Sequence, residues 1–161
     1  MTAGVTFPHP PAAARAALDR LTASDPDLAG IEARAGPLPW RTRTPGFPGL
    51  LQAMVAQQIS NQAAAAIWGR LRAVAGVLEP AGMLALSDEV LRTAGLSRPK
   101  IAHARVLAAA FLDGTLDPVA IAAMDDETAV ATIAAVRGIG RWTAEVYLLF
   151  AQGYRSTDIT A

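Results

Sequence analysis

The most informative part of the sequence is AVATIAAVRGIGRWTA, residues 129–144. Apolar residues spaced three and four apart predict one helix before the sequence RGIG and a second helix directly after it. Gly138 and Gly140 flank Ile139 in the linking turn, and glycine allows backbone angles that a side chain would forbid. We therefore predict two helices joined by a tight hairpin, with Ile139 packed back between them.

The predicted hairpin offers backbone hydrogen-bond donors. The N–H groups of the turn and of the first residues of the next helix have no intrahelical acceptor, and together they form a site for an anion. Thr143 and the small Ala144 let the two helices cross closely. A phosphate of a DNA backbone fits such a site, and a plain helical corner with a tight glycine turn is the alternative. The pattern resembles the helix-hairpin-helix DNA-binding motif, placed here at about residues 129–146.

Composition limits the class of protein. A length of 161 residues corresponds to about one domain, so we expect a single helical domain over residues 1–161. Hydrophobic residues make up 52% of the chain and charged residues 17%, which excludes a disordered protein. Because the chain has no cysteine, disulfides and thiolate zinc sites are excluded. No apolar stretch is long enough to cross a membrane, and the start MTAGVTFPHPP has no signal-peptide pattern. We expect a cytoplasmic protein without membrane contact.

Helical spacing dominates the rest of the chain, and the alternation typical of strands is hard to find. We predict an all-α fold of about nine helices. Ser24, followed by Asp25 and Pro26, predicts the start of the second helix, and Gly36 predicts its end. A further helix is predicted from Phe47 to Gln58.

Charge gives a weaker signal, because 14 basic and 14 acidic residues leave a net charge of zero. The basic residues are nevertheless grouped in two stretches that lack acids, between Glu32 and Glu79 and between Glu89 and Asp113. These stretches contain Arg34, Arg41, Arg43, Arg70, Arg72, Arg92, Arg98, Lys100 and Arg105. A neutral protein can still present one positive face to DNA. The alternative is that these arginines solvate helix surfaces.

Four segments carry a more specific resemblance. They are PGFPGLL at 45–51, MVAQQIS at 54–60, GLSRPKIAHARVLA at 95–108 and GIGRWTAEVYLLFA at 138–151. In order and spacing they resemble the 3-methyladenine DNA glycosylase II family, over about residues 15–158. The resemblance implies the helix-hairpin-helix DNA glycosylase fold, without a β domain ahead of it. It also implies base-excision repair of double-stranded DNA containing alkylated bases, by flipping the damaged purine and hydrolysing its N-glycosidic bond. We expect a monomer when the domain is complete.

The resemblance also implies DNA contacts. The turn would hold a phosphate, with a structural monovalent cation at the Val136 and Gly138 backbone as its only cofactor. Gln57 and Gln58 could also be a simple polar helix end. By the resemblance, the DNA-binding residues are Gly138, Ile139, Gly140, Arg141, Thr143, Lys100, Gln58 and Ser60. Association with the nucleoid would follow from these contacts.

Trp142 matches an aromatic residue that lines the base pocket in the family, where its electron-rich face suits a cationic base. A core tryptophan at a helix start is the alternative. Relatives that cleave the DNA strand carry a lysine nucleophile at this position, whereas the single lysine here is Lys100. A monofunctional, hydrolytic glycosylase is therefore expected.

The catalytic acid is the open question in the sequence. The family spacing, counted from Trp142, places the catalytic aspartate just after Ala161, and the helices that complete the family domain would follow it. One interpretation is that the C-terminal part of an active enzyme is missing. Another is a DNA-binding relative without catalysis. In the third, Asp158 serves as the acid, although a chain end positions a carboxylate poorly.

Overall fold

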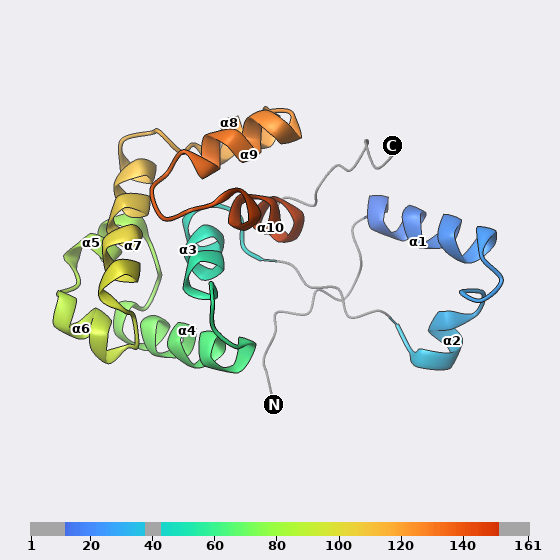
Figure 1. The fold of residues 1–161 in the computed structure, drawn as a ribbon, viewed down its shortest axis with the longest axis horizontal. Helices are drawn as coiled ribbons and strands as arrows, with labels where there is room; N and C mark the ends of the chain where they lie inside the picture. The colour runs from blue at the N-terminus through green and yellow to red at the C-terminus, as the bar shows by residue number, and fades with distance from the viewer. Residues whose placement is uncertain (1–11, 38–42, 152–161) are drawn as a thin grey trace. The chain divides into compact units, whose positions relative to one another are not determined.

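The computed structural model describes residues 12–37 and 43–151, and these residues form ten helices and no strand, which confirms the all-α prediction (Figure 1). They fall into two compact units, one containing residues 12–37 and the other residues 43–151. The single domain over residues 1–161 remains a prediction. None of the helices in these two ranges is long and apolar enough to span a membrane.

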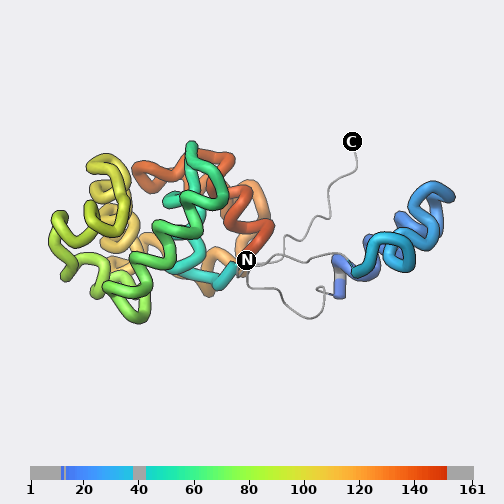
Figure 2. Tube along the Cα trace, turned by 90° about the horizontal axis from the view of Figure 1, so that it is seen from below, coloured from blue at the N-terminus to red at the C-terminus, as the bar shows by residue number. Residues whose placement is uncertain are grey.

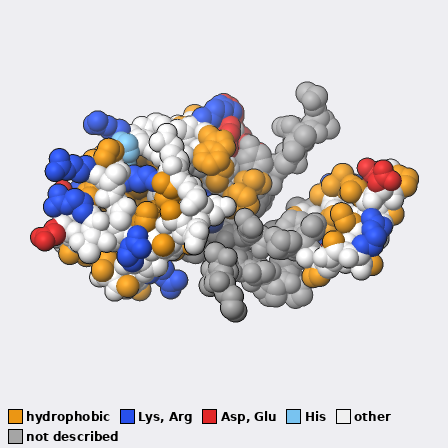
Figure 3. Space-filling view, turned by 60° about the horizontal axis from the view of Figure 1, so that its bottom comes forward, with side chains coloured by type: hydrophobic (Ala, Val, Ile, Leu, Met, Phe, Trp, Pro, Cys, Tyr) orange, Lys and Arg blue, Asp and Glu red, His pale blue; other side chains and the backbone are white. Residues whose placement is uncertain are grey.

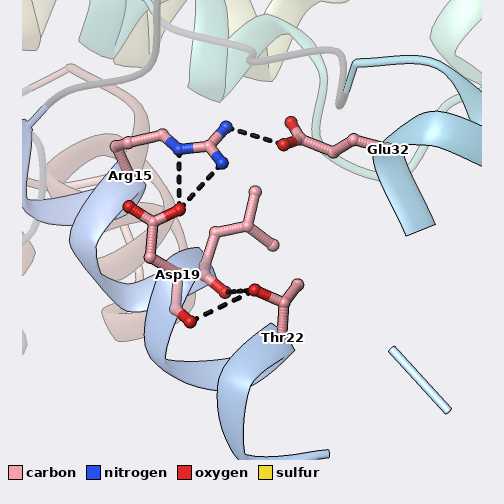
Figure 4. Close-up of polar contacts among 5 residues, drawn as sticks. Arg15, Asp19, Thr22 and Glu32 are labelled. Atoms are coloured by element: carbon pink, nitrogen blue, oxygen red, sulfur yellow. Dashed lines mark hydrogen bonds and ion pairs between the residues drawn. The ribbon is translucent and has the colours of Figure 1, made fainter. Parts of the chain in front are cut away.

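The smaller unit contains α1 (Ala12–Ser24) and α2 (Ile31–Ala35). Arg15 links the two helices, because its guanidinium contacts Asp19 on α1 and Glu32 on α2 at 2.8 and 2.7 Å (Figure 4). The prediction that the second helix begins near Asp25 is wrong, since α2 begins at Ile31. The Asp25 carboxylate accepts the Asp27 N–H in a local turn, and Gly30 has a left-handed φ of 70°.

Eight helices make up the larger unit. They are α3 (Phe47–Val55), α4 (Asn61–Ala75), α5 (Pro80–Ala85), α6 (Asp88–Thr93), α7 (Arg98–Leu112), α8 (Pro118–Ala123), α9 (Asp126–Ala134) and α10 (Arg141–Ala151). Helix α3 packs against α4, α7 and α10, so it occupies the middle of the unit (Figures 1 and 2). Helix α10 also packs against α9, and α7 packs against α5 and α6.

The core gathers around α3, whose apolar residues Leu50, Leu51 and Met54 are fully buried. Tyr147 of α10 is buried beside them, and its hydroxyl accepts a hydrogen bond from the Gly46 N–H at 2.8 Å. Gly49 allows this close packing, because a Cβ at that position would overlap the Thr44 carbonyl and lie 3.2 Å from the Tyr147 ring. Helix α10 is thereby fixed on α3, and with it the turn that precedes α10.

Serine and aspartate side chains cap five helix starts in the larger unit. The hydroxyl of Ser60 accepts the Ala63 N–H at the start of α4, and the Asp125 carboxylate accepts the Thr128 N–H at the start of α9. Ser87, Ser97 and Asp117 cap α6, α7 and α8 in the same way. Local sequence therefore determines where most of these helices begin.

Candidate nucleic-acid interface

The hairpin lies between α9 and α10, where the sequence predicted it. Ile139 is 4% exposed and belongs to the core, so the prediction that it packs back between the helices is confirmed. Gly138 has a φ of +95°, and a Cβ there would lie 2.6 Å from His103 Cβ on α7. Gly140 differs, because a Cβ there would meet nothing within 4 Å and its φ lies outside the left-handed region. The fold therefore requires glycine at 138 but not at 140.

The turn presents backbone donors at the start of α10. In the described part of the chain, the N–H groups of Gly140, Arg141 and Trp142 donate to no protein acceptor. The Gly140 carbonyl closes the first turn by accepting the Thr143 and Ala144 N–H groups at 2.9 and 3.1 Å. Three consecutive unpaired donors at the positive end of a helix dipole can bind an anion.

Gln57 connects the end of α3 to the hairpin. Its side-chain Nε2 donates to the Gly138 carbonyl at 3.2 Å and to the Thr143 hydroxyl oxygen at 2.8 Å. Thr143 is 3% exposed, and this second contact is partly buried. The sequence reasoning did not find this link. Helical spacing could have indicated that Gln57 points inward, since it follows the buried Met54 by three residues.

Lys100 of α7 lies against the same segment. Its ammonium donates to the Val55 carbonyl at 2.6 Å and to the Gln57 carbonyl at 2.9 Å. Burial lowers the pKa of this ammonium. The prediction that the helix extends to Gln58 is wrong, because α3 ends at Val55. At this end, the Val55 and Gln57 carbonyls accept hydrogen bonds from Lys100. The DNA contact expected of Lys100 remains a prediction.

Arg141 is committed to two carboxylates. Its guanidinium donates to both oxygens of Glu127 at 2.7 and 2.8 Å, and to Glu145 at 2.8 Å. The Arg141 hydrogen bonds hold the pKa of Glu127 below its usual range, and the Glu127 carboxylate raises the pKa of Arg141. A phosphate contact by this guanidinium remains a prediction, and it would compete with the two acids.

Trp142 is 67% exposed, so the alternative of a core tryptophan is excluded and the side chain is accessible to a partner. Gln58 is also exposed, and its φ of 57° is the left-handed exception among the described residues other than glycine. Ser60 is exposed, with its hydroxyl engaged as the cap of α4. Through the Gln57 bridge, the turn that carries Gln58 and the helix start that carries Trp142 are neighbours.

Basic side chains divide into two groups. Several arginines are used inside the fold: Arg70 donates to the Ala94 carbonyl, Arg105 to the Leu84 and Leu86 carbonyls, and Arg43 lies over the Phe150 ring. Burial lowers the pKa of Arg43. By contrast, four exposed arginines of the larger unit's described residues make no hydrogen bond or ion pair: Arg72, Arg92, Arg98 and Arg137. Figure 3 shows basic side chains scattered over one face of this unit, with few acidic ones between them.

The remaining expectations concern a monovalent cation at the hairpin and the candidate acid Asp158. Within the two described ranges, no three His, Cys, Asp or Glu residues lie together as a metal site. The Val136 carbonyl accepts the Ile139 N–H and the Gly138 carbonyl accepts Gln57 Nε2, so each oxygen keeps one lone pair for a monovalent cation. Asp158 lies outside the described residues.

No protein-family model matches the chain. The DNA-3-methyladenine glycosylase 1 of Schizosaccharomyces pombe is 29% identical over 105 residues, which cover 63% of this chain and 46% of that protein. The crystal structure of a DNA-3-methyladenine glycosidase from Bacillus halodurans matches with a TM-score of 0.69 and 33% identity, over 83% of this chain and 62% of that one. The chain is therefore similar to 3-methyladenine DNA glycosylases in sequence and in fold.

The same fold recurs in a solved structure of lower sequence identity. The S. pombe 3-methyladenine DNA glycosylase, solved in complex with abasic DNA, matches with a TM-score of 0.74 and 24% identity, over 85% of this chain and 70% of that one. The chain spans about half the length of the curated relative it matches. These matches confirm the helix-hairpin-helix DNA glycosylase fold expected from the four sequence segments.

Proposed function

We propose that this protein is a monofunctional DNA glycosylase that hydrolyses the N-glycosidic bond of alkylated purines, as the first step of base-excision repair. The observation that carries the proposal is the hairpin, where three unpaired N–H groups adjoin an exposed tryptophan. The likeness to 3-methyladenine DNA glycosylases supports the same activity. Its partner would be double-stranded DNA containing alkylated bases, bound by a monomer.

Each part of this interface has a role in the proposal. The N–H groups of Gly140, Arg141 and Trp142 bind a backbone phosphate, which fixes the register of the duplex without reading its sequence. A monovalent cation at the Val136 and Gly138 carbonyls would add positive charge beside that phosphate. Exposed Gln58 and Ser60 contact the DNA near the flipped nucleotide.

The chemistry follows from the substrate. An alkylated purine already carries positive charge, so it leaves with little acid assistance, and the Trp142 ring suits the cationic base. A carboxylate is needed to stabilise the oxocarbenium-like transition state and to position a water molecule. Trp142 stands where strand-cleaving relatives have a lysine, so the proposed reaction is hydrolysis without strand cleavage. The resemblance places this acid just after Ala161, and Asp158 is the alternative within residues 1–161.

Base release tests this function. The 161-residue chain is incubated with methylated duplex DNA, and released 3-methyladenine and 7-methylguanine are measured beside an Asp158→Asn variant. Release by the chain supports the proposal, and loss of release in Asp158→Asn assigns the acid to Asp158. Absence of release, with salt-sensitive DNA binding retained, would contradict base release by these 161 residues and leave DNA binding as their function.

A further inference from the structure

We propose that Gln57 is a positioning residue that fixes the hairpin for DNA binding, and that Lys100 fixes Gln57 in turn. This inference rests on the proposed function, because it concerns how the same hairpin meets DNA. Both residues act through other groups in this proposal, and neither needs to touch the substrate. The three elements they join are the end of α3, the start of α7 and the hairpin.

The Gln57 amide contacts the hairpin on both sides of its unpaired donors. The Gly138 carbonyl precedes the N–H groups of residues 140–142, and the Thr143 hydroxyl follows them. One Nε2 atom bonds both acceptors, so it uses both of its hydrogens on this one segment. The amide therefore sets the orientation of residues 138–143 relative to α3. Without it, two partly buried acceptors would lose their donor.

Lys100 holds the backbone from which the Gln57 side chain extends. The ammonium lies 2.9 Å from the Gln57 carbonyl and 2.6 Å from the Val55 carbonyl, where α3 ends. A direct contact between Lys100 and a DNA phosphate would require the ammonium to leave these carbonyls. Its placement therefore favours an indirect role, in which Lys100 positions Gln57 and Gln57 positions the hairpin.

The same arrangement ties the hairpin to the next residue of the chain. Gln58 follows Gln57 directly, is exposed and has a left-handed φ of 57°. Because Gln57 is bonded to residues 138 and 143, the turn at Gln58 and the hairpin form one frame. Both proposed DNA contacts are then preorganised together, which reduces the entropy lost on binding.

Substitution of Gln57 by leucine tests the proposal. Gln57→Leu keeps the side-chain size and removes both hydrogen bonds, and Gln62→Leu makes the same change at an exposed position of α4. We expect Gln57→Leu to weaken binding to duplex DNA on the order of tenfold, because two partly buried acceptors lose their donor. Gln62→Leu should bind within about twofold of wild type. Binding is measured well below the melting temperature of each variant.

Thr143→Val gives a second route in case Gln57→Leu folds poorly. It removes one of the two acceptors, so a smaller loss of DNA affinity is expected, and combining it with Gln57→Leu should add less than the sum of the two effects. Additive effects would contradict the link between these residues. Equal DNA affinity in Gln57→Leu and wild type would overturn the proposal. Failure of the proposed function is distinguishable, because it appears as absence of base release by the wild-type chain, whereas this proposal is judged by the DNA affinity of Gln57→Leu relative to wild type.

Salt dependence separates the two roles of Lys100. If Lys100 acts through Gln57, Lys100→Met lowers DNA affinity but leaves the dependence of log affinity on log salt unchanged. If Lys100 contacts a phosphate, that slope decreases by about one, and this half of the proposal is wrong. The Lys100→Met and Gln57→Leu double variant should bind no more weakly than Gln57→Leu alone.

Discussion

The hairpin and the α1–α2 unit are held by different kinds of contact. At the hairpin, Gln57 bonds groups 81 and 86 residues away in the chain, and one of them belongs to the buried Thr143. In the smaller unit, α2 has no buried residue, and the link to α1 is the exposed ion pair between Arg15 and Glu32. Exposed ion pairs contribute little, whereas buried hydrogen bonds and tight packing are costly to break. The contacts that are costlier to break therefore lie where DNA is proposed to bind.

The largest effect is expected at the hairpin glycines. Gly138→Ala adds a side chain at a φ of +95° and against His103, which should lower the free energy of unfolding by about 2–4 kcal/mol. Gly140→Ala is the matched control, since its Cβ would meet nothing within 4 Å. Denaturant unfolding of both variants measures the difference. Similar stability for the two variants would contradict this description of the turn.

A smaller effect is expected at the contact between α10 and the residue before α3. Tyr147→Phe removes the hydroxyl that accepts the Gly46 N–H, and leaves that buried donor without this partner. The expected loss is about 1–3 kcal/mol in the free energy of unfolding, by chemical denaturation. An unchanged midpoint would show that this hydrogen bond does not help to fix α10 on α3.

Acid should weaken the ion pair beside the hairpin. Because Arg141 holds the pKa of Glu127 below its usual range, this pair stabilises the fold above the ordinary glutamate pKa of about 4.3. That contribution is lost as pH falls through the lower folded-state pKa. Glu127→Gln should therefore melt slightly below wild type near neutral pH, and the two melting temperatures should converge in acid. A constant difference at every pH would contradict this assignment.

The smallest effect is expected in the α1–α2 unit. Arg15→Met removes the ion pairs to Asp19 and Glu32 while keeping the aliphatic stem. We expect a slight increase in amide hydrogen exchange within α1 and α2, which high salt should abolish, and no change in the melting of the larger unit. A large fall in its melting temperature would show that the comparison between the two regions is wrong.

Local signals predicted the elements of this fold well. The glycine pattern located the hairpin, and serine and aspartate side chains cap the starts of α4 and α9 as local sequence favours. The boundaries that failed depend on other contacts. Helix α3 ends before the predicted Gln58, at Val55, whose carbonyl accepts a hydrogen bond from Lys100, 45 residues away in the chain. The late start of α2 follows from the turn at Asp25 and the left-handed Gly30.

The site was less predictable than the fold. A local pattern located the hairpin, whereas the DNA contacts of its residues and the pocket role of the exposed Trp142 stay predictions. The bridge made by Gln57 could not be predicted, because it depends on the tertiary approach of α3 and the hairpin. Likewise, the pairing of Arg141 with Glu127 joins residues 14 positions apart across the turn.

The most direct test of the hairpin as a phosphate site is the affinity of Gly140→Ala for duplex DNA. The added methyl group stands in open space beside the unpaired N–H groups of residues 140–142, so the fold should tolerate it while a phosphate should not. We predict unchanged stability and an affinity lower by about tenfold, the order expected when a hydrogen-bonded anion contact is lost. Binding equal to wild type over a range of salt concentrations would contradict this account.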